Sequence, residues 1–215
     1  MKFRLVVALV LPLAFSCGCS PSTSAVFDTV KAIARRDTGA APSSLDPRFR
    51  YLRVTTQGGS AGFLALGYVD DTPRGQLEVW YSAQRQVLRL QDGRLAGATG
   101  VATEWHDVSL PPLPSWRELG RAPAPYRWTR TRDVMPGYRY GVNDMLEVRR
   151  IDPPLRSQLA GMDALQLTWF EETSATLPPA RYAVQIDEGS GTVIYAEQCL
   201  APELCLSWQR WKAAQ

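Results

Sequence analysis

The sequence predicts a mainly β protein, an antiparallel meander forming a barrel or a sandwich, with one short helix near its N-terminus. Three observations favour this fold class. Short runs with alternating apolar and polar residues recur along most of the 215 residues. Turn-forming pairs such as Gly58-Gly59 and Asp92-Gly93 separate these runs. No helical stretch is long enough to give repeated strand–helix–strand units.

The first 18 residues are predicted to be a lipoprotein signal peptide. A positively charged start precedes an apolar stretch, Leu5 to Phe15, which is too short to span a bilayer as a permanent helix. The following segment, SCGCSPSTS, offers two cysteines for acylation. We expect acylation at Cys19, because the small residue Gly18 precedes it, and Cys17 is the alternative. An ordinary secreted protein with neither cysteine acylated is the remaining interpretation.

Acylation predicts where the protein resides. Several acyl chains on one cysteine hold a protein at a membrane more durably than one chain does. Ser20 after Cys19 resembles the sorting pattern for the outer membrane, so we expect an anchor there and a body facing the periplasm. Removing Lys2 and Arg4 with the signal leaves 22 basic and 21 acidic residues, a balance that provides no electrostatic footprint for nucleic acid.

Residues 19–47 are predicted to form a polar tether and an amphipathic helix. The segment AVFDTVKAIARR, from Ala25 to Arg36, places apolar residues at helical spacing. Ser24 before it is suited to be the N-cap, and the two final arginines suit the C-terminal end.

Residues 48–215 are predicted to form a single all-β domain. The candidate strands are Arg50–Thr56, Gly62–Val69, Gln76–Ser82, Gln86–Gln91, Tyr126–Arg132, Tyr138–Val142, Leu146–Ile151, Ala164–Glu171, Arg181–Asp187, Thr192–Gln198 and Leu204–Trp211. The proline-rich region from Leu110 to Tyr126 is interpreted as a long crossover on one face of this domain, with a domain linker as the alternative.

Cys199 and Cys205 are predicted to form a disulfide. They lie close together in the segment CLAPELC, where Pro202 helps the chain to turn, and an oxidising compartment favours the bond. A metal site is not supported, because no histidine or further cysteine lies nearby and a tetrahedral site needs four ligands. We expect no cofactor.

The segment Gly58–Gly62 matches G-x-S-x-G, the pattern around a hydrolase nucleophile, which would be Ser60. That role needs a helix after the serine, whereas the segment FLALGYVDD ends in β-type residues and a turn. His106, the one histidine, is expected in a polar loop. Neighbouring acids at Asp70-Asp71 and Glu171-Glu172 would face opposite ways on a strand. We therefore expect a turn between two strands and no enzyme.

The segment YRWTRTR is a candidate contact for a glycan or a protein partner. On a strand its alternate residues Tyr126, Trp128, Arg130 and Arg132 share one face, and Arg139 and Tyr140 follow in YRYG. Sugar rings stack on exposed aromatic rings, and arginine binds carboxylates and phosphates. The alternative is that the aromatic residues belong to the core and the arginines to its rim.

Three stretches resemble the YjbF/GfcB family, the group 4 capsule polysaccharide lipoproteins. They are YLRVTTQGGSAGFLALGYVDD (Tyr51–Asp71), VWYSAQRQVLRLQDGRLAGATGV (Val79–Val101) and, near the end, YAVQIDEGSGTVIYAEQCLAPEL. In the second stretch, Trp80, Gly93, Arg94, Leu95 and Gly100 fall at the family's places. The Cys199–Cys205 pair departs from the family pattern.

The resemblance implies an all-β lipoprotein of capsule or exopolysaccharide production, facing the periplasm, with no catalytic residues to carry over. Two functions stay open. The first is a non-catalytic accessory factor that docks on an outer-membrane exopolysaccharide export protein. The second is a module that binds the polysaccharide, an acidic one, directly.

Overall fold

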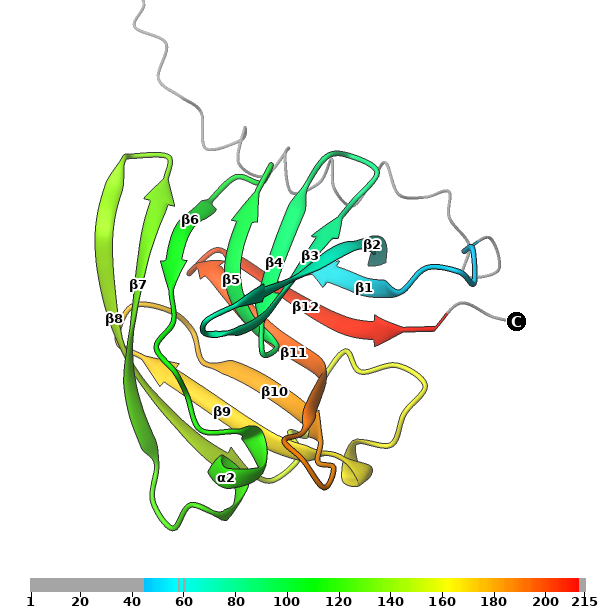
Figure 1. The fold of residues 1–215 in the computed structure, drawn as a ribbon, viewed down its shortest axis with the longest axis vertical. Coiled ribbons are helices and arrows are strands. Elements are labelled where there is room, and N and C mark those ends of the chain that lie inside the picture. Colours follow the sequence, from blue (N-terminus) through cyan, green and yellow to red (C-terminus); the bar gives the residue numbers. More distant parts are fainter. Residues whose placement is uncertain (1–44, 58, 60, 213–215) are drawn as a thin grey trace, which may run out of the picture.

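A computed structural model describes residues 45–57, 59 and 61–212, which form a closed barrel of antiparallel strands (Figure 1). The twelve strands follow one another around the barrel in chain order, and the last pairs with the first. The predicted antiparallel meander is confirmed, as a barrel. The strands are β1 (Tyr51–Thr56), β2 (Ala61–Thr72), β3 (Gly75–Tyr81), β4 (Val87–Gln91), β5 (Arg94–Thr99), β6 (Glu104–Ser109), β7 (Tyr126–Met135), β8 (Arg139–Ile151), β9 (Thr168–Ser174), β10 (Ala180–Gln185), β11 (Thr192–Ala201) and β12 (Leu204–Trp211).

Several strands differ from the prediction. Strands β5 and β6 were not predicted, because the small residues of RLAGAT and the polar residues of EWHDVS hide the period of two. The two short strands expected within residues 138–151 are one strand, β8. The strand expected from Ala164 begins only at Thr168, because Ala164–Gln166 form a 3-10 turn, η2, after the N-cap Asp163.

The helix predicted near the N-terminus lies outside the described residues, so it stays a prediction. Within the described ranges the one α-helix is α2 (Trp116–Arg121), inside the region expected to be a crossover. A capping box begins it: the Glu118 amide donates to Ser115 Oγ at 3.2 Å, and the Ser115 amide donates to the Glu118 carboxylate at 2.8 Å. The Ser-x-x-Glu spacing was therefore a helix signal that the proline content masked.

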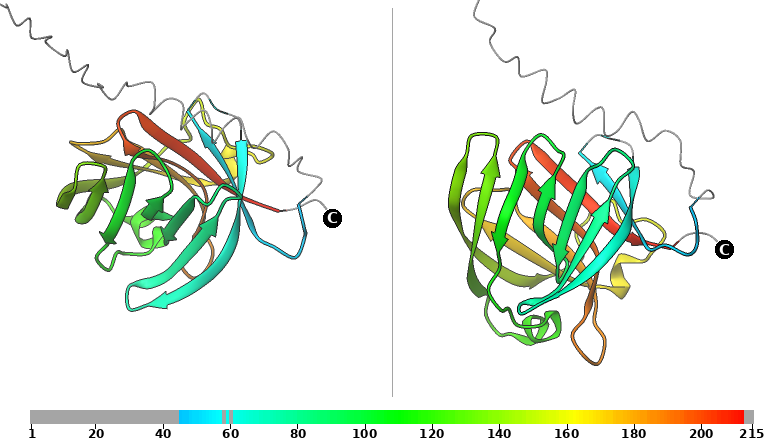
Figure 2. Two further views of the ribbon diagram at one scale, coloured as in Figure 1. Left: turned by 90° about the horizontal axis from the view of Figure 1, so that it is seen from above. Right: turned by 45° about the horizontal axis from the view of Figure 1, so that its top comes forward.

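Because neighbouring strands are antiparallel, the connections alternate between the two ends of the barrel. One end carries the β2–β3 and β4–β5 turns, α2, the 152–167 segment and the β10–β11 loop. We call this the helix end. The opposite end carries the β3–β4, β5–β6 and β7–β8 connections among others. Two further views show the strands wrapping around one interior (Figure 2).

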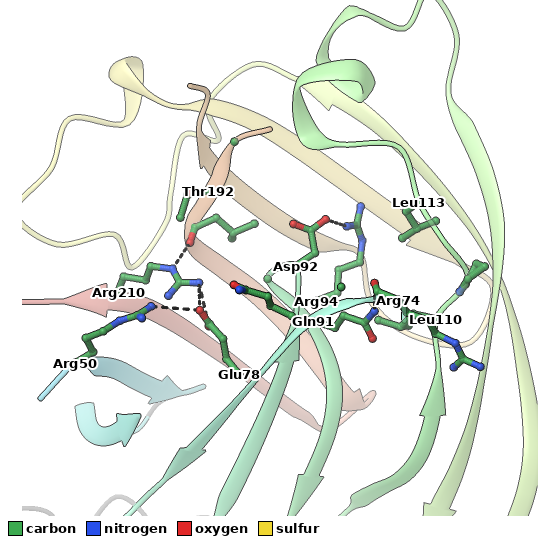
Figure 3. A pocket seen from close by; sticks show the side chains of 16 residues that line it. Arg50, Arg74, Glu78, Gln91, Asp92, Arg94, Leu110, Leu113, Thr192 and Arg210 are labelled. Carbon is green, nitrogen blue, oxygen red and sulfur yellow. Dashed lines mark hydrogen bonds and ion pairs between the residues drawn. The ribbon is translucent and has the colours of Figure 1, made fainter. Parts of the chain in front are cut away.

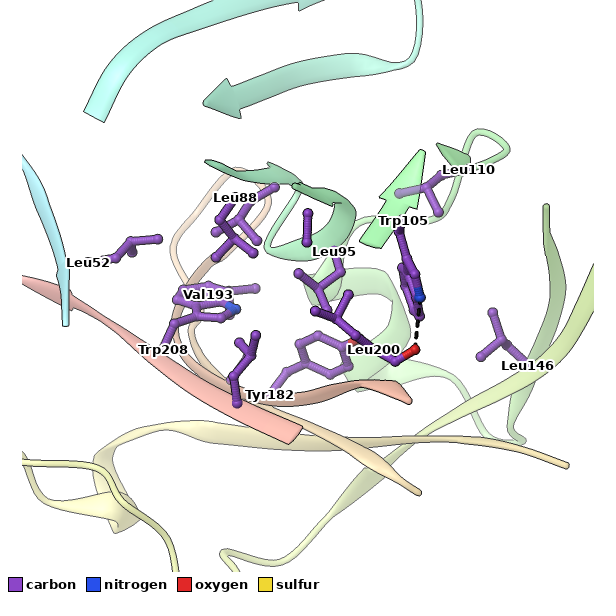
Figure 4. Close-up of a cluster of buried hydrophobic side chains, with 14 of the residues drawn as sticks. Leu52, Leu88, Leu95, Trp105, Leu110, Leu146, Tyr182, Val193, Leu200 and Trp208 are labelled. Carbon is purple, nitrogen blue, oxygen red and sulfur yellow. Dashed lines mark hydrogen bonds between the residues drawn. The ribbon is translucent and has the colours of Figure 1, made fainter. Parts of the chain in front are cut away.

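The interior is a packed apolar core. Alternate residues of each strand point inward, and tryptophans contribute much of the volume: Trp80, Trp105 and Trp208 are each at most 1% exposed. They pack with leucines from β1, β4 and β5 (Figure 4). The Trp105 indole donates to the Leu200 carbonyl oxygen at 2.9 Å across the barrel. Packing of this kind fills the barrel with side chains and leaves open space mainly at its ends and on its outer surface.

A second layer lies outside the barrel. The segment between β8 and β9, residues 152–167, covers the outer face of β9 to β11, where Trp169 and Tyr195 form a small apolar cluster. The Gln158 amide donates to the Tyr195 hydroxyl at 2.9 Å, and both backbone polar groups of Ala160 bond the Gln209 side chain. This long connection is therefore tied down rather than free.

The predicted disulfide is confirmed: Cys199 on β11 and Cys205 on β12 are opposite each other in register and bonded. Within the part of the chain that the structure describes, no helix combines the length and apolar character needed to cross a membrane.

Candidate functional site

The face predicted to contact a glycan is mostly turned inward. Tyr126, Trp128, Arg130 and Arg132 do share one side of β7, but the last three are only 7%, 5% and 4% exposed. They point into the barrel, so the expected exposed aromatic and arginine surface does not exist there. Tyr126 is 36% exposed at the helix end. The remaining candidates, Arg139 and Tyr140, are exposed at the opposite end and are not brought together with it.

The two inward arginines of β7 belong to a buried ion network. Asp144 on β8 accepts from Arg130 Nη2 at 2.9 Å and from Arg132 Nε at 2.6 Å, and Thr176 Oγ1 donates to it at 2.8 Å. Both guanidinium groups also lie 4.5 Å from the Trp105 ring centre. Burial raises the pKa of Asp144, but the bonds from Arg132, Thr176 and Arg130 outweigh it and lower the pKa to about 2. This network is structural.

A second buried network lies nearer the helix end, around Arg94. Its Nε donates to Glu172 at 3.3 Å, and its guanidinium stacks 3.9 Å from the Trp116 ring centre. The Tyr182 hydroxyl lies 3.1 Å from Glu172 Oε1, and burial raises the Tyr182 pKa well above its usual value, so the hydroxyl stays protonated. Trp116 comes from α2, so this helix inserts its first side chain into the barrel.

Above this network lies a pocket of about 520 Å³ at the helix end, which we call the mouth pocket (Figure 3). Every segment that lines it reaches the same end of the barrel: the residue before β1, the β2–β3 and β4–β5 turns, the chain after β6, and the neighbouring ends of β11 and β12. Their charged side chains are Arg50, Arg74, Glu78, Asp92, Arg94 and Arg210. Four arginines against two carboxylates leave a formal excess of two positive charges.

Glu78 is held between two of these arginines. Arg210 Nη2 contacts both carboxylate oxygens, at 2.9 and 3.0 Å, and its Nε donates to the Val193 carbonyl oxygen at 2.9 Å. Arg50 Nη2 lies farther from the same carboxylate, at 3.4 Å, on a side chain that is 60% exposed. Arg210 is thus fixed in place, whereas Arg50 is held weakly.

The serine motif does not form a nucleophile elbow. Ser60 itself lies outside the described residues, but the residues that follow it form strand β2, not the helix that an elbow needs. His106 lies on β6 rather than in the expected loop, and its Nε2 is 2.7 Å from a Glu104 carboxylate oxygen. The adjacent acids of β9 do face opposite ways: Glu172 points inward, and Glu171 bonds the outer arginine Arg149.

The described residues contain no group of three or more His, Cys, Asp or Glu side chains that could hold a metal ion.

Residues 45–207 match the family described as "Group 4 capsule polysaccharide lipoprotein gfcB, YjbF". The chain belongs to the YjbF family. The match spans the barrel from before β1 into β12, so the resemblance drawn from three short stretches is confirmed over nearly the whole described chain.

A solved structure supports this at the level of the fold. The hypothetical lipoprotein YmcC from Escherichia coli K12 is 18% identical, with a TM-score of 0.55, and the alignment covers 89% of this chain and 94% of that one. No curated protein matches this member of the YjbF family.

Sequence reasoning missed the mouth pocket. Arg94 was noticed only as part of the QDGRL stretch that marks the YjbF family, and Arg50, Arg74 and Arg210 were not singled out. These four arginines are up to 160 residues apart in the sequence, so no local pattern joins them. A usable signal was that arginines stand at or beside predicted strand ends, where barrel topology brings side chains together.

Proposed function

We propose that this protein is a non-catalytic accessory lipoprotein of capsule polysaccharide production, anchored in the outer membrane and facing the periplasm, where it acts by contact with the export machinery. The observation that supports this most is the family match over residues 45–207. A barrel whose interior is filled by packed side chains fits a role in binding, because it offers its ends and its outer surface as contact areas.

Deletion of the gene, with complementation, tests this proposal. We expect a strain that lacks the protein to carry less surface capsule, and we expect the full-length protein to co-purify with an outer-membrane export protein after cross-linking. Capsule in unchanged amount and chain length after deletion would contradict the proposal.

Direct binding of the polysaccharide is the second candidate function. The mouth pocket favours it, because arginines at an open cavity suit an acidic polymer. The two functions separate experimentally: a purified protein that binds the polysaccharide without any partner supports the second, and co-purification without glycan affinity supports the first.

A further inference from the structure

We propose that the mouth pocket binds an acidic sugar unit of the polysaccharide, one that carries a carboxylate or a phosphate, through its arginines. This inference rests on the second candidate function, direct polysaccharide binding. It moves the glycan contact from the β7 residues that the sequence suggested to the helix end of the barrel.

The first argument is the availability of positive charge. Arg74, in the β2–β3 turn, is exposed and forms no ion pair with any described residue; its Nη1 donates to the neutral Ser109 hydroxyl at 2.9 Å. The weakly held Arg50 lies at another edge of the same pocket. An arginine without a carboxylate partner can form two parallel hydrogen bonds to a carboxylate or a phosphate.

The turn that carries Arg74 is well ordered. Thr72 Oγ1 donates to the Gly75 carbonyl oxygen at 2.7 Å and accepts from the Arg74 amide at 3.2 Å. Gln91, from the neighbouring hairpin, donates to the Arg74 carbonyl oxygen at 2.6 Å. Because the backbone is fixed from both sides, the Arg74 side chain is presented with little loss of backbone entropy on binding.

The second, independent observation is an unsatisfied group in the inner wall. Arg94 is 1% exposed, and its Nη2 has no hydrogen-bond partner among the described residues. Figure 3 shows its side chain rising along the pocket beside Asp92, which accepts from Nη1 at 3.3 Å. Buried polar groups are nearly always bonded. Because Nη2 is itself closed to solvent, an anionic group in the pocket would become its acceptor only after the side chains around Arg94 shift.

The pocket is also large enough for part of a polymer. A neighbouring groove of about 580 Å³ shares Arg50 and Arg210 with it, and Tyr51, Met162 and Trp211 are among the residues that line the rest. Aromatic faces pack against the C–H faces of sugar rings. An acidic unit at the arginines would therefore be followed by a less polar unit against these side chains.

The test is calorimetry on the full-length acylated protein in detergent, with tetragalacturonate as the acidic probe and maltotetraose as the neutral one. We expect the protein to bind tetragalacturonate and not maltotetraose. We expect Arg74→Gln to weaken the affinity for tetragalacturonate at least about fivefold. Arg85→Gln is the matched control, because Arg85 is an exposed arginine on the β3–β4 connection at the opposite end. It is expected to change affinity by less than about twofold.

Glu78→Gln provides a variant that gains affinity, so that misfolding cannot imitate the result. This change removes the carboxylate that competes for Arg50 and Arg210, and we expect tetragalacturonate to bind several-fold more tightly. Glucose 1-phosphate is then added as a competitor. Displacement supports a site that takes phosphate and carboxylate alike, and no displacement supports a site restricted to carboxylate sugars.

Three results overturn the inference. The first is that maltotetraose binds as tightly as tetragalacturonate. The second is that Arg74→Gln keeps the wild-type affinity, and the third is that Arg139→Gln, rather than Arg74→Gln, loses binding. Failure here is distinct from failure of the proposed function. If the protein binds no glycan but the deletion strain has a capsule defect, the binding site is excluded and the accessory role is supported. If Arg74→Gln loses binding but fully complements the deletion strain, the binding site is supported and its part in capsule production is excluded.

Discussion

At the scale of single residues, the arginines inside and around the barrel form two groups with different roles. Arg130 and Arg132 are buried and share one carboxylate, so their charge is used within the fold. Arg50 and Arg74 are exposed at the mouth pocket with little or no local compensation. The first group bears on stability, and the second is free to contact the ligand that we propose for the mouth pocket.

Replacing the carboxylate of Asp144, which Arg130 and Arg132 share, is expected to lower the free energy of unfolding. Asp144→Asn leaves two guanidinium groups in the barrel without a counter-ion, and breaking a buried pair in this way costs about 3–5 kcal/mol. Urea unfolding followed by tryptophan fluorescence measures the free energy of unfolding, and Asp152→Asn, at an exposed aspartate, is the control. A loss below about 1 kcal/mol for Asp144→Asn would show that the network is not a stabilising element.

The lowered pKa of Asp144 also predicts how the stability of the protein depends on pH. That pKa of about 2 in the folded protein lies below an unfolded value of about 3.9. The contribution of Asp144 is therefore complete above the unfolded pKa and is lost as the pH falls from about 5 to about 2. The loss is on the order of 2 kcal/mol. Unfolding free energies measured across this range should fall less steeply for Asp144→Asn than for the wild type; parallel curves would contradict the assignment.

At the scale of elements, the β4–β5 hairpin connects the fold to the mouth pocket. Its two-residue turn, Asp92-Gly93, has positive φ at both residues, 49° and 74°, which is the type I′ geometry of tight hairpins. The turn places Asp92 in the pocket wall and starts β5 at Arg94. The sequence signal Asp-Gly was thus both a turn marker and, through its neighbour, part of the candidate site.

Gly93→Ala is expected to disturb this hairpin more than backbone strain alone would. An added Cβ would overlap the side chain of Val193 on β11, in addition to the cost of positive φ. We expect a loss of about 2–4 kcal/mol, against about 1 kcal/mol for Gly161→Ala, whose φ of 68° is similar but whose Cβ would meet open space. Thermal unfolding compares the two. Adding Val193→Ala should recover part of the loss, and equal losses for the two glycines would argue against the overlap.

The helix α2 is the other element that joins fold and pocket. Its capping box begins a helix of only six residues, and the first of them, Trp116, is fully buried between Arg94, Phe170 and Tyr182. A short helix has little stability of its own. The packing of Trp116 in the barrel end therefore holds the helix, and the helix in turn holds the guanidinium of Arg94 in place.

At the scale of the whole molecule, closure of the barrel gathers distant strand ends into one opening and leaves no strand edge unpaired in the described sheet. The described chain enters β1 and leaves β12 at the helix end, the end that carries the mouth pocket. A tether from a lipid anchor would therefore join the body at that end.

The anchor itself is tested by substitution. We expect Cys19→Ser to abolish fatty-acid attachment and to release the protein from the membrane fraction, because no other durable membrane contact is predicted. Mass spectrometry of the N-terminal peptide identifies the acylated residue, and Cys17→Ser is the matched control. Retained acylation in Cys19→Ser with loss in Cys17→Ser would move the anchor to the alternative cysteine.

The sequence alone determined the antiparallel β class, most strand positions, the disulfide and the resemblance to the YjbF family, because periodicity, turn residues and short motifs are local properties. It could not decide between barrel and sandwich, since that depends on whether β12 reaches β1. Nor could it decide which side of β7 faces inward: a period of two shows that Trp128, Arg130 and Arg132 share a face, and closure buries that face. The mouth pocket likewise exists only in three dimensions, because Arg50, Arg74, Arg94 and Arg210 meet only when the barrel closes.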